Sequence, residues 1–278
     1  MIRVDAHLHV WRAGPPGANA TSTLVPPSID VAIEDARRVM VEHDIARAVL
    51  VQPVFRGADN DYVAACARAE PNRFAAVAAF DPGIECPEAL LEHCAGQGCR
   101  GFRLRPRLTT EEKLFGDPAI YSLWETATRL GMVISVLCGP QHLGMLSSLA
   151  DRFTEVPIVI DHLGHPNPAI GVDHPQFRQL LALASRPRVF VKLSGYYHFS
   201  DADFPYENCW SLIRAVYEQF GPRRLLWGSD FPHVTVASGY GPCQCLLERV
   251  LDDWPAADRG AVMGQNAREL YWPKTVSI

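Results

Sequence analysis

Short apolar runs recur along the chain, and each is followed by a turn and then by an amphipathic stretch. Several runs are β-branched and nearly continuous, which is typical of strands buried on both faces of a parallel sheet. This rhythm predicts eight strands that alternate with helices. The predicted strands are 3–10, 47–52, 74–81, 99–104, 132–138, 157–161, 189–193 and 225–228.

The stretches between the runs carry start and stop signals of helices. Pro118 suits a first helical turn, Asp117 suits the N-cap before it, and Gly131 suits a helix end. Strands alternating with helices favour an α/β fold, here a distorted (β/α)8 TIM barrel in one domain, 1–278, with no linker and a long first loop after residue 14. The predicted helices are 30–43, 59–69, 87–95, 117–130, 142–153, 175–185, 206–220, 242–253 and 256–271.

Composition narrows the functional classes. The chain has 278 residues, 48 % hydrophobic and 21 % charged, with a net charge of −5, which argues against nucleic-acid and membrane partners. No apolar stretch approaches the roughly 20 residues of a membrane span. The first residues lack the pattern of a signal peptide, so we expect a cytoplasmic protein with reduced cysteines. The sequence leaves open whether the chain forms a homo-oligomer.

In a parallel barrel, catalytic groups lie at the carboxyl ends of the strands, and polar residues gather at those ends here. His7 and His9 are two apart on the first strand, so their side chains share a face. Two imidazoles that converge in this way can bind a metal or polarise a substrate oxygen. The other strand ends supply Gln52, Arg103, Arg105, His162, His165, Lys192, Tyr196, Tyr197, His198, Asp230 and His233.

The arginines suggest the character of the substrate. Arg103 and Arg105 are two residues apart on strand four, so their side chains share a face. Guanidinium groups at a barrel mouth need a partner, and a carboxylate is the simplest one. We expect a small anionic substrate, with Gln52, Tyr196 and His198 as further contacts.

Taken together, these segments resemble the amidohydrolase superfamily, and within it the lactonase-like branch with 2-pyrone-4,6-dicarboxylate hydrolase and sugar-lactone hydrolases. The resemblance runs from residue 3 to residue 271. The segments that carry it are Asp5-Ala6-His7-Leu8-His9-Val10-Trp11, Gly57-Ala58-Asp59-Asn60, Gly101-Phe102-Arg103, Asp161-His162-Leu163-Gly164, Lys192-Leu193-Ser194-Gly195 and Trp227-Gly228-Ser229-Asp230-Phe231-Pro232.

The resemblance implies a hydrolase that opens a small, carboxylated lactone of the pyrone, muconolactone or aldonolactone type. It assigns catalysis to Asp230 and His162. It also makes His7, His9 and Asp230 ligands of one divalent metal, for which zinc is the first choice. Strand five offers only Cys138 where metal-dependent members often carry histidine, so a site without metal stays open. A two-metal site is disfavoured because Arg103 stands where such members carry lysine.

Other functions stay open at this point. A metal-dependent decarboxylase or an amide hydrolase of the same superfamily would use similar residues. A third alternative is a catalytically inactive barrel that acts as a small-molecule binding or interaction module. Such a protein would be expected to have lost the histidines and the aspartate, and this chain has all of them. The sequence assigns no role to Lys192, His165, His233 or Cys138.

Overall fold

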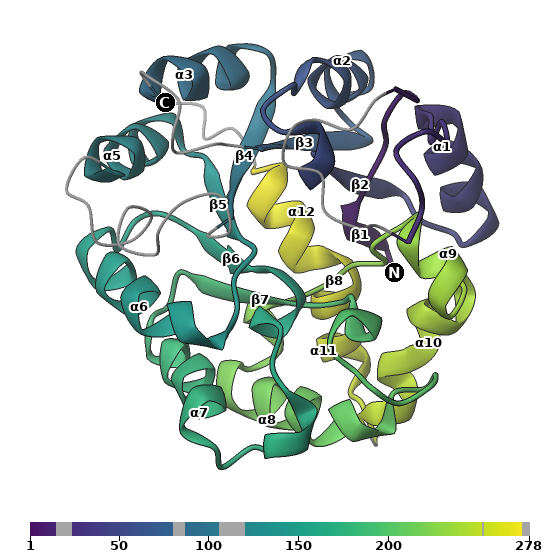
Figure 1. Cartoon of the computed structure of the whole chain (residues 1–278), viewed down its shortest axis with the longest axis vertical. Coiled ribbons are helices and arrows are strands. Elements are labelled where there is room, and N and C mark those ends of the chain that lie inside the picture. Colours follow the sequence, from purple (N-terminus) through teal and green to yellow (C-terminus); the bar gives the residue numbers. More distant parts are fainter. Residues whose placement is uncertain (15–23, 80–86, 106–119, 252, 274–278) are drawn as a thin grey trace.

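A computed structural model describes residues 1–14, 24–79, 87–105, 120–251 and 253–273. Within them, eight parallel strands form one sheet in the order β1 to β8, and the helices surround it (Figure 1). The predicted barrel is confirmed. The strands are β1 (Val4–Leu8), β2 (Arg47–Val51), β3 (Phe74–Ala79), β4 (Cys99–Leu104), β5 (Val133–Val136), β6 (Ile158–Ile160), β7 (Val189–Leu193) and β8 (Leu225–Trp227).

Helices follow the strands broadly as the sequence predicts, with differences at their ends, and one short helix after the last strand, His233–Ala237, is not among the predicted ones. The region predicted as 256–271 is divided by a π-helical turn at Ala261–Gln265. The candidate caps Asp117 and Pro118 lie outside the described residues. The helices are α1 (Ile33–Glu42), α2 (Asp61–Ala69), α3 (Pro87–Gly96), α5 (Tyr121–Leu130), α6 (Leu143–Arg152), α7 (Pro175–Ala182), α8 (Trp210–Phe220), α9 (His233–Ala237), α10 (Tyr240–Val250), α11 (Ala256–Gly260) and α12 (Asn266–Tyr271).

Alternation along the strands divides the core into two layers. Small inward side chains such as Val4, Ala6 and Val77 fill the barrel, and Tyr271 of α12 packs against them. Outward side chains such as Leu8 pack under the helices. In β1 the pairing with β2 shifts register between Asp5 and Leu8, so the inward face passes from Ala6 to His7. This irregularity directs the first histidine toward the barrel centre.

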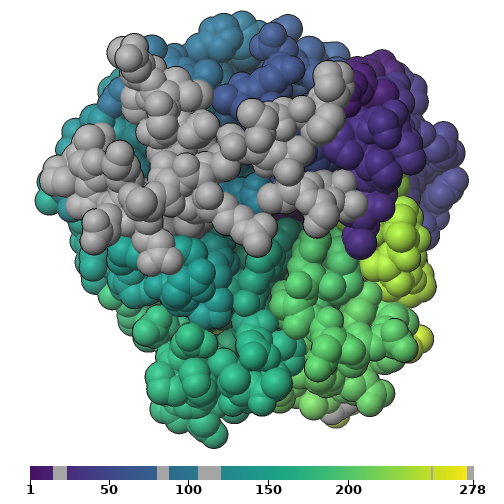
Figure 2. Space-filling view, viewed as in Figure 1, coloured from purple at the N-terminus to yellow at the C-terminus, as the bar shows by residue number. Residues whose placement is uncertain are grey.

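The barrel closes where the two ends of the sheet meet, at a seam between β1 and β8. Two backbone hydrogen bonds join its upper part, from Asp230 N to His7 O at 2.8 Å and from His9 N to Phe231 O at 2.7 Å. The strands approach so closely that a Cβ on Gly228 would lie 2.7 Å from the Cβ of His7. Early and late segments therefore lie side by side, as the purple and yellow-green regions show (Figures 1 and 2).

One buried carboxylate fastens the lower part of the seam. Asp5 Oδ1 accepts from the backbone N–H groups of His7 and Ser229 at 3.0 and 2.9 Å. Its Oδ2 accepts from Ser229 Oγ at 2.5 Å and from the Tyr240 hydroxyl at 2.9 Å. Four hydrogen bonds to one side chain hold the strand ends that carry the polar residues. The part of the chain that the structure describes contains no helix with the length and apolar character needed to cross a membrane.

Candidate active site

A layer of buried charges lies at the centre of the barrel. Asp161 Oδ1 is 2.9 Å from Lys192 Nζ and 3.6 Å from His7 Nδ1, and Asp161 Oδ2 is 3.8 Å from Arg103 Nη1. Burial alone would raise the pKa of Asp161, but Lys192 and His7 outweigh burial and hold the pKa well below its usual value. The carboxylate therefore stays charged and compensates the buried cations. Lys192, whose role the sequence left open, is part of this internal ion pair.

His7, His9 and Asp230 converge above this layer. The Nε2 atoms of His7 and His9 are 3.2 Å apart, and Asp230 Oδ1 lies 3.1 Å from His9 Nε2 and 3.6 Å from His7 Nε2. His9 Nδ1 donates to the Val51 carbonyl at 2.7 Å, which fixes the ring with Nε2 facing Asp230. Ligands of one tetrahedral zinc, with bonds of about 2.0–2.2 Å, are separated by similar distances. The predicted ligand set fits one divalent ion.

The second carboxylate oxygen of Asp230 has partners of its own. The Tyr197 hydroxyl donates to Oδ2, and His198 Nε2 is 2.9 Å away. Asp230 has a left-handed backbone with φ of 61°, which aspartate tolerates better than most residues. Burial raises the pKa of Asp230, but the imidazole of His162 and the hydrogen bonds from His198 and His9 hold it well below its usual value. Asp230 is therefore ionised at neutral pH.

His162 follows β6 and turns its ring toward the same point. Its Nδ1 is 2.9 Å from Ser194 Oγ, and its ring centroid is 4.6 Å from that of His7. Gly195, with φ of 64°, makes room for the ring, because a Cβ there would lie 2.4 Å from His162 Nδ1. Burial lowers the pKa of His162 well below its usual value, so the ring is neutral. A neutral imidazole with Nδ1 held by serine can present Nε2 to a substrate oxygen.

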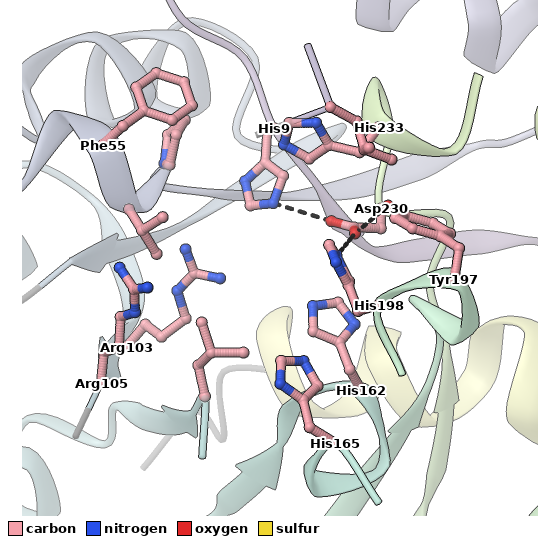
Figure 3. Close-up of a pocket in the computed structure, with 14 residues that line it drawn as sticks. His9, Phe55, Arg103, Arg105, His162, His165, Tyr197, His198, Asp230 and His233 are labelled. Carbon is pink, nitrogen blue, oxygen red and sulfur yellow. Dashed lines mark hydrogen bonds and ion pairs between the residues drawn. The ribbon is translucent and has the colours of Figure 1, made fainter. Parts of the chain in front are cut away.

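These groups surround a cavity of about 400 Å³ at the carboxyl ends of the strands. Arg103 and Arg105 lie on one side of it and Asp230 on the other (Figure 3). Pro53, Phe55 and Leu137 provide apolar lining. Two guanidinium groups and one carboxylate are the charged side chains lining the cavity within the described residues, so it favours an anionic ligand.

The structure separates the predicted substrate contacts into two groups. Arg103, Arg105 and His198 line the cavity. Gln52 and Tyr196 are not among the lining residues. The Gln52 side chain donates instead to the Asp59 carbonyl, and Tyr196 is buried among aromatic rings.

Three lining residues carried little signal in the sequence. Tyr197 reaches the cavity because it follows Tyr196 in a 3₁₀ turn at Tyr196–His198, and the turn selects which tyrosine faces inward. His165 stacks on His162, with ring centroids 5.5 Å apart, and His233 lies beside His9. Cys138 is buried, and burial raises its pKa to about 12, so it stays a neutral thiol.

The amidohydrolase family model matches residues 4–272, nearly the whole chain. The chain belongs to this family.

Curated relatives of this amidohydrolase include lactone hydrolases. It is 27 % identical to L-fucono-1,5-lactonase of Burkholderia ambifaria, over 97 % of this chain and 95 % of the relative. It is 31 % identical to 4-sulfomuconolactone hydrolase of Rhizobium radiobacter, over 93 % and 90 % of the two chains. Among solved structures, a putative 2-pyrone-4,6-dicarboxylic acid hydrolase of Pseudomonas putida is 27 % identical, with a TM-score of 0.79 and coverage of 98 % and 97 %.

The buried histidines of this amidohydrolase predict a loss of stability in acid. Burial lowers the pKa of His7 to about 3 and the pKa of His233 to about 4. Burial also lowers the pKa of His162 well below its usual value. The unfolded chain binds protons below pH about 6.5, whereas the folded chain does not, so stability is full above that pH and falls below it. Each histidine contributes a slope of about 1.4 kcal/mol per pH unit.

Urea unfolding of the chelator-treated protein at a series of pH values measures this slope. The raised pKa of Asp5 acts in the opposite direction, and three histidines outweigh it. We expect a free energy of unfolding that is flat above neutral pH and declines steadily from pH about 6.5 to 5. A flat profile through that window would show that the histidines are already protonated in the fold.

Proposed function

We propose that this protein hydrolyses a small anionic lactone. The convergence of Asp230 with the imidazoles of His7, His9 and His162, beside a cavity that has arginines on its other side, carries the proposal. A base, polarising groups and an anion site are the parts that ester hydrolysis of a charged cyclic substrate needs. The lactone hydrolases among its curated relatives support the same reaction class.

The arginines would bind the acid group. Arg103 is buried, and its Nη2 donates to the Gln52 carbonyl at 2.6 Å, which fixes the guanidinium in place. Arg105 lies two residues further along the same face of the chain and also lines the cavity. A carboxylate held by guanidinium groups would place the lactone ring between them and Asp230.

Hydrolysis then follows from the chain's own residues. Asp230 accepts a proton from water while the water oxygen forms a bond to the lactone carbonyl carbon. His162, whose Nδ1 is held by Ser194, donates from Nε2 to the negative charge that develops on the carbonyl oxygen. The ring carbon–oxygen bond breaks, Asp230 returns the proton to the leaving oxygen, and the product is a hydroxy acid.

His7, His9 and Asp230 would hold one divalent metal, for which zinc is the first choice. A bound metal supplies Lewis acidity and lowers the pKa of water toward about 7. The roles of His162 and the arginines are the same with the metal as without it.

The test is turnover of a panel of lactones with and without a carboxylate, together with metal analysis before and after chelation. We expect turnover that is faster for the carboxylated lactones. Loss of activity on chelation and its return with zinc would assign His7, His9 and Asp230 as ligands, and retained activity would assign them to hydrogen bonding. If the protein hydrolysed none of the lactones but turned over an aromatic acid or an amide, decarboxylation or amide hydrolysis would replace the proposal.

A further inference from the structure

A left-handed turn follows β6 and carries two of the histidines that line the cavity. His162, Leu163, Gly164 and His165 all have positive φ, at 50°, 53°, 69° and 49°. The backbone N–H of His165 donates to the carbonyl of His162 at 2.9 Å, which closes the turn. In a turn closed between residues three apart, the side chains of those two residues lie one above the other. His162 and His165 therefore lie together at the cavity (Figure 3).

The backbone of this turn is unfavourable in itself. Side chains of L-amino acids disfavour the left-handed region, and three of the four residues are not glycine. Residues held in such conformations cluster at functional sites, where the surrounding contacts keep them in place. At this site, the turn places a second imidazole over the first.

The ring of His165 is nearly parallel to the ring of His162. Their centroids are 5.5 Å apart, and their planes differ by 14°. The rings of His7 and His198 also lie against His162, but they are tilted from it by 50° and 56°. Ser194 Oγ, 2.9 Å from Nδ1, fixes one atom of the His162 ring and does not by itself fix the plane of the ring. A parallel neighbour does so, because tilting of His162 would break the stacked contact.

We propose that His165 is a positioning residue for hydrolysis. Its ring fixes the plane of the His162 ring, so that Nε2 of His162 faces the carbonyl oxygen of a bound lactone. This inference rests on the proposed lactone hydrolysis and adds to it a residue whose role the sequence left open. It also gives the left-handed turn a function, because the turn brings the two rings together.

The kinetic test separates the ring of His165 from its backbone. His165→Asn provides a residue type that tolerates the left-handed region but has no ring. We expect kcat on a carboxylated lactone to fall about tenfold, with KM nearly unchanged and a melting temperature close to that of the wild type. His165→Phe restores a ring on a residue type that tolerates this backbone less well, so it should recover most of kcat at a lower melting temperature.

His93→Asn is the matched control. His93 is exposed on α3 and is not among the residues that line the cavity. The same replacement there should leave kcat unchanged.

A second readout does not depend on turnover. In the wild type and in His165→Phe, we expect one sharp NMR signal from the Cε1–H group of His162, assigned through its loss in His162→Gln. In His165→Asn, this signal should broaden or split, because the ring of His162 would sample more than one orientation.

Three results would overturn the inference. An unchanged kcat in His165→Asn would show that the reaction does not need the ring. Equal losses of kcat in His165→Asn and His165→Phe would show that the polar atoms of His165 act, and not its stacking. An unchanged His162 signal in His165→Asn would show that His165 does not hold the ring. Wild-type protein that hydrolysed no lactone would overturn the proposed function instead, and the NMR comparison would still decide whether His165 positions His162.

Discussion

Replacement of Asp230 by asparagine is expected to lower kcat on a lactone on the order of a thousandfold while the protein stays folded. Asparagine keeps the size of the side chain and can still contact His9 and His198, but its amide cannot take a proton from water. Asp230 is the one carboxylate among the described residues that line the cavity, so no other acid of that lining can replace it. The measurement is steady-state turnover at neutral pH, with the melting temperature as the check on folding.

Asp173→Asn provides the matched control. Asp173 pairs with Arg178 at the surface, and its side chain is 85 % exposed, so the same chemical change there should leave turnover and stability unaltered. If Asp230→Asn kept more than about a tenth of the wild-type kcat, another group would have to be the base.

Asp161→Asn is expected to destabilise the fold by about 3–5 kcal/mol, because it leaves buried cations without their counter-charge. Lys192 Nζ is 2.9 Å from Asp161, and both side chains are fully buried. Urea unfolding at neutral pH would measure the loss. The stabilisation from Asp161 is present above the usual carboxyl pKa and is lost as the pH falls toward its lowered value in the fold.

A second variant separates charge from packing. In Asp161→Asn/Lys192→Met the unpaired ammonium is gone, so we expect the double variant to be more stable than Asp161→Asn alone. If it were less stable, the two losses would be independent, and the ion pair would not be the reason that these residues occur together.

Much of the architecture follows from local pattern. The β-branched runs of buried strands, separated by helix signals, predict the barrel, and strand polarity then places His7, His9, Arg103, His162 and Asp230 at one end. These residues do meet around one cavity or directly beneath it. Periodicity predicted the strands one or two residues too long at several ends, as in β1, where His9 instead bonds to Phe231 across the seam.

Contacts between distant segments could not be predicted in the same way. Tyr196 and Tyr197 are equivalent in the sequence, and the sense of a 3₁₀ turn decides between them. Gln52 ends a strand like the other site residues, but a carbonyl of the following loop takes its amide. The charge of Asp161 matters because Lys192 lies 2.9 Å away from it. Asp161 follows β6 and Lys192 lies on β7, so no spacing in the sequence predicts that the two meet.

The seam between β1 and β8 also determines when the site can exist. Asp5 and Ser229 are separated by 224 positions, and His9 and Asp230 by 221. During synthesis, the histidines of the first strand are made early, and the aspartate is added only after most of the chain has been synthesised. A chain that stops before β8 would carry both histidines, both arginines and His162 but no base. Assembly of the last strand is therefore the step that turns a nearly finished barrel into a complete site.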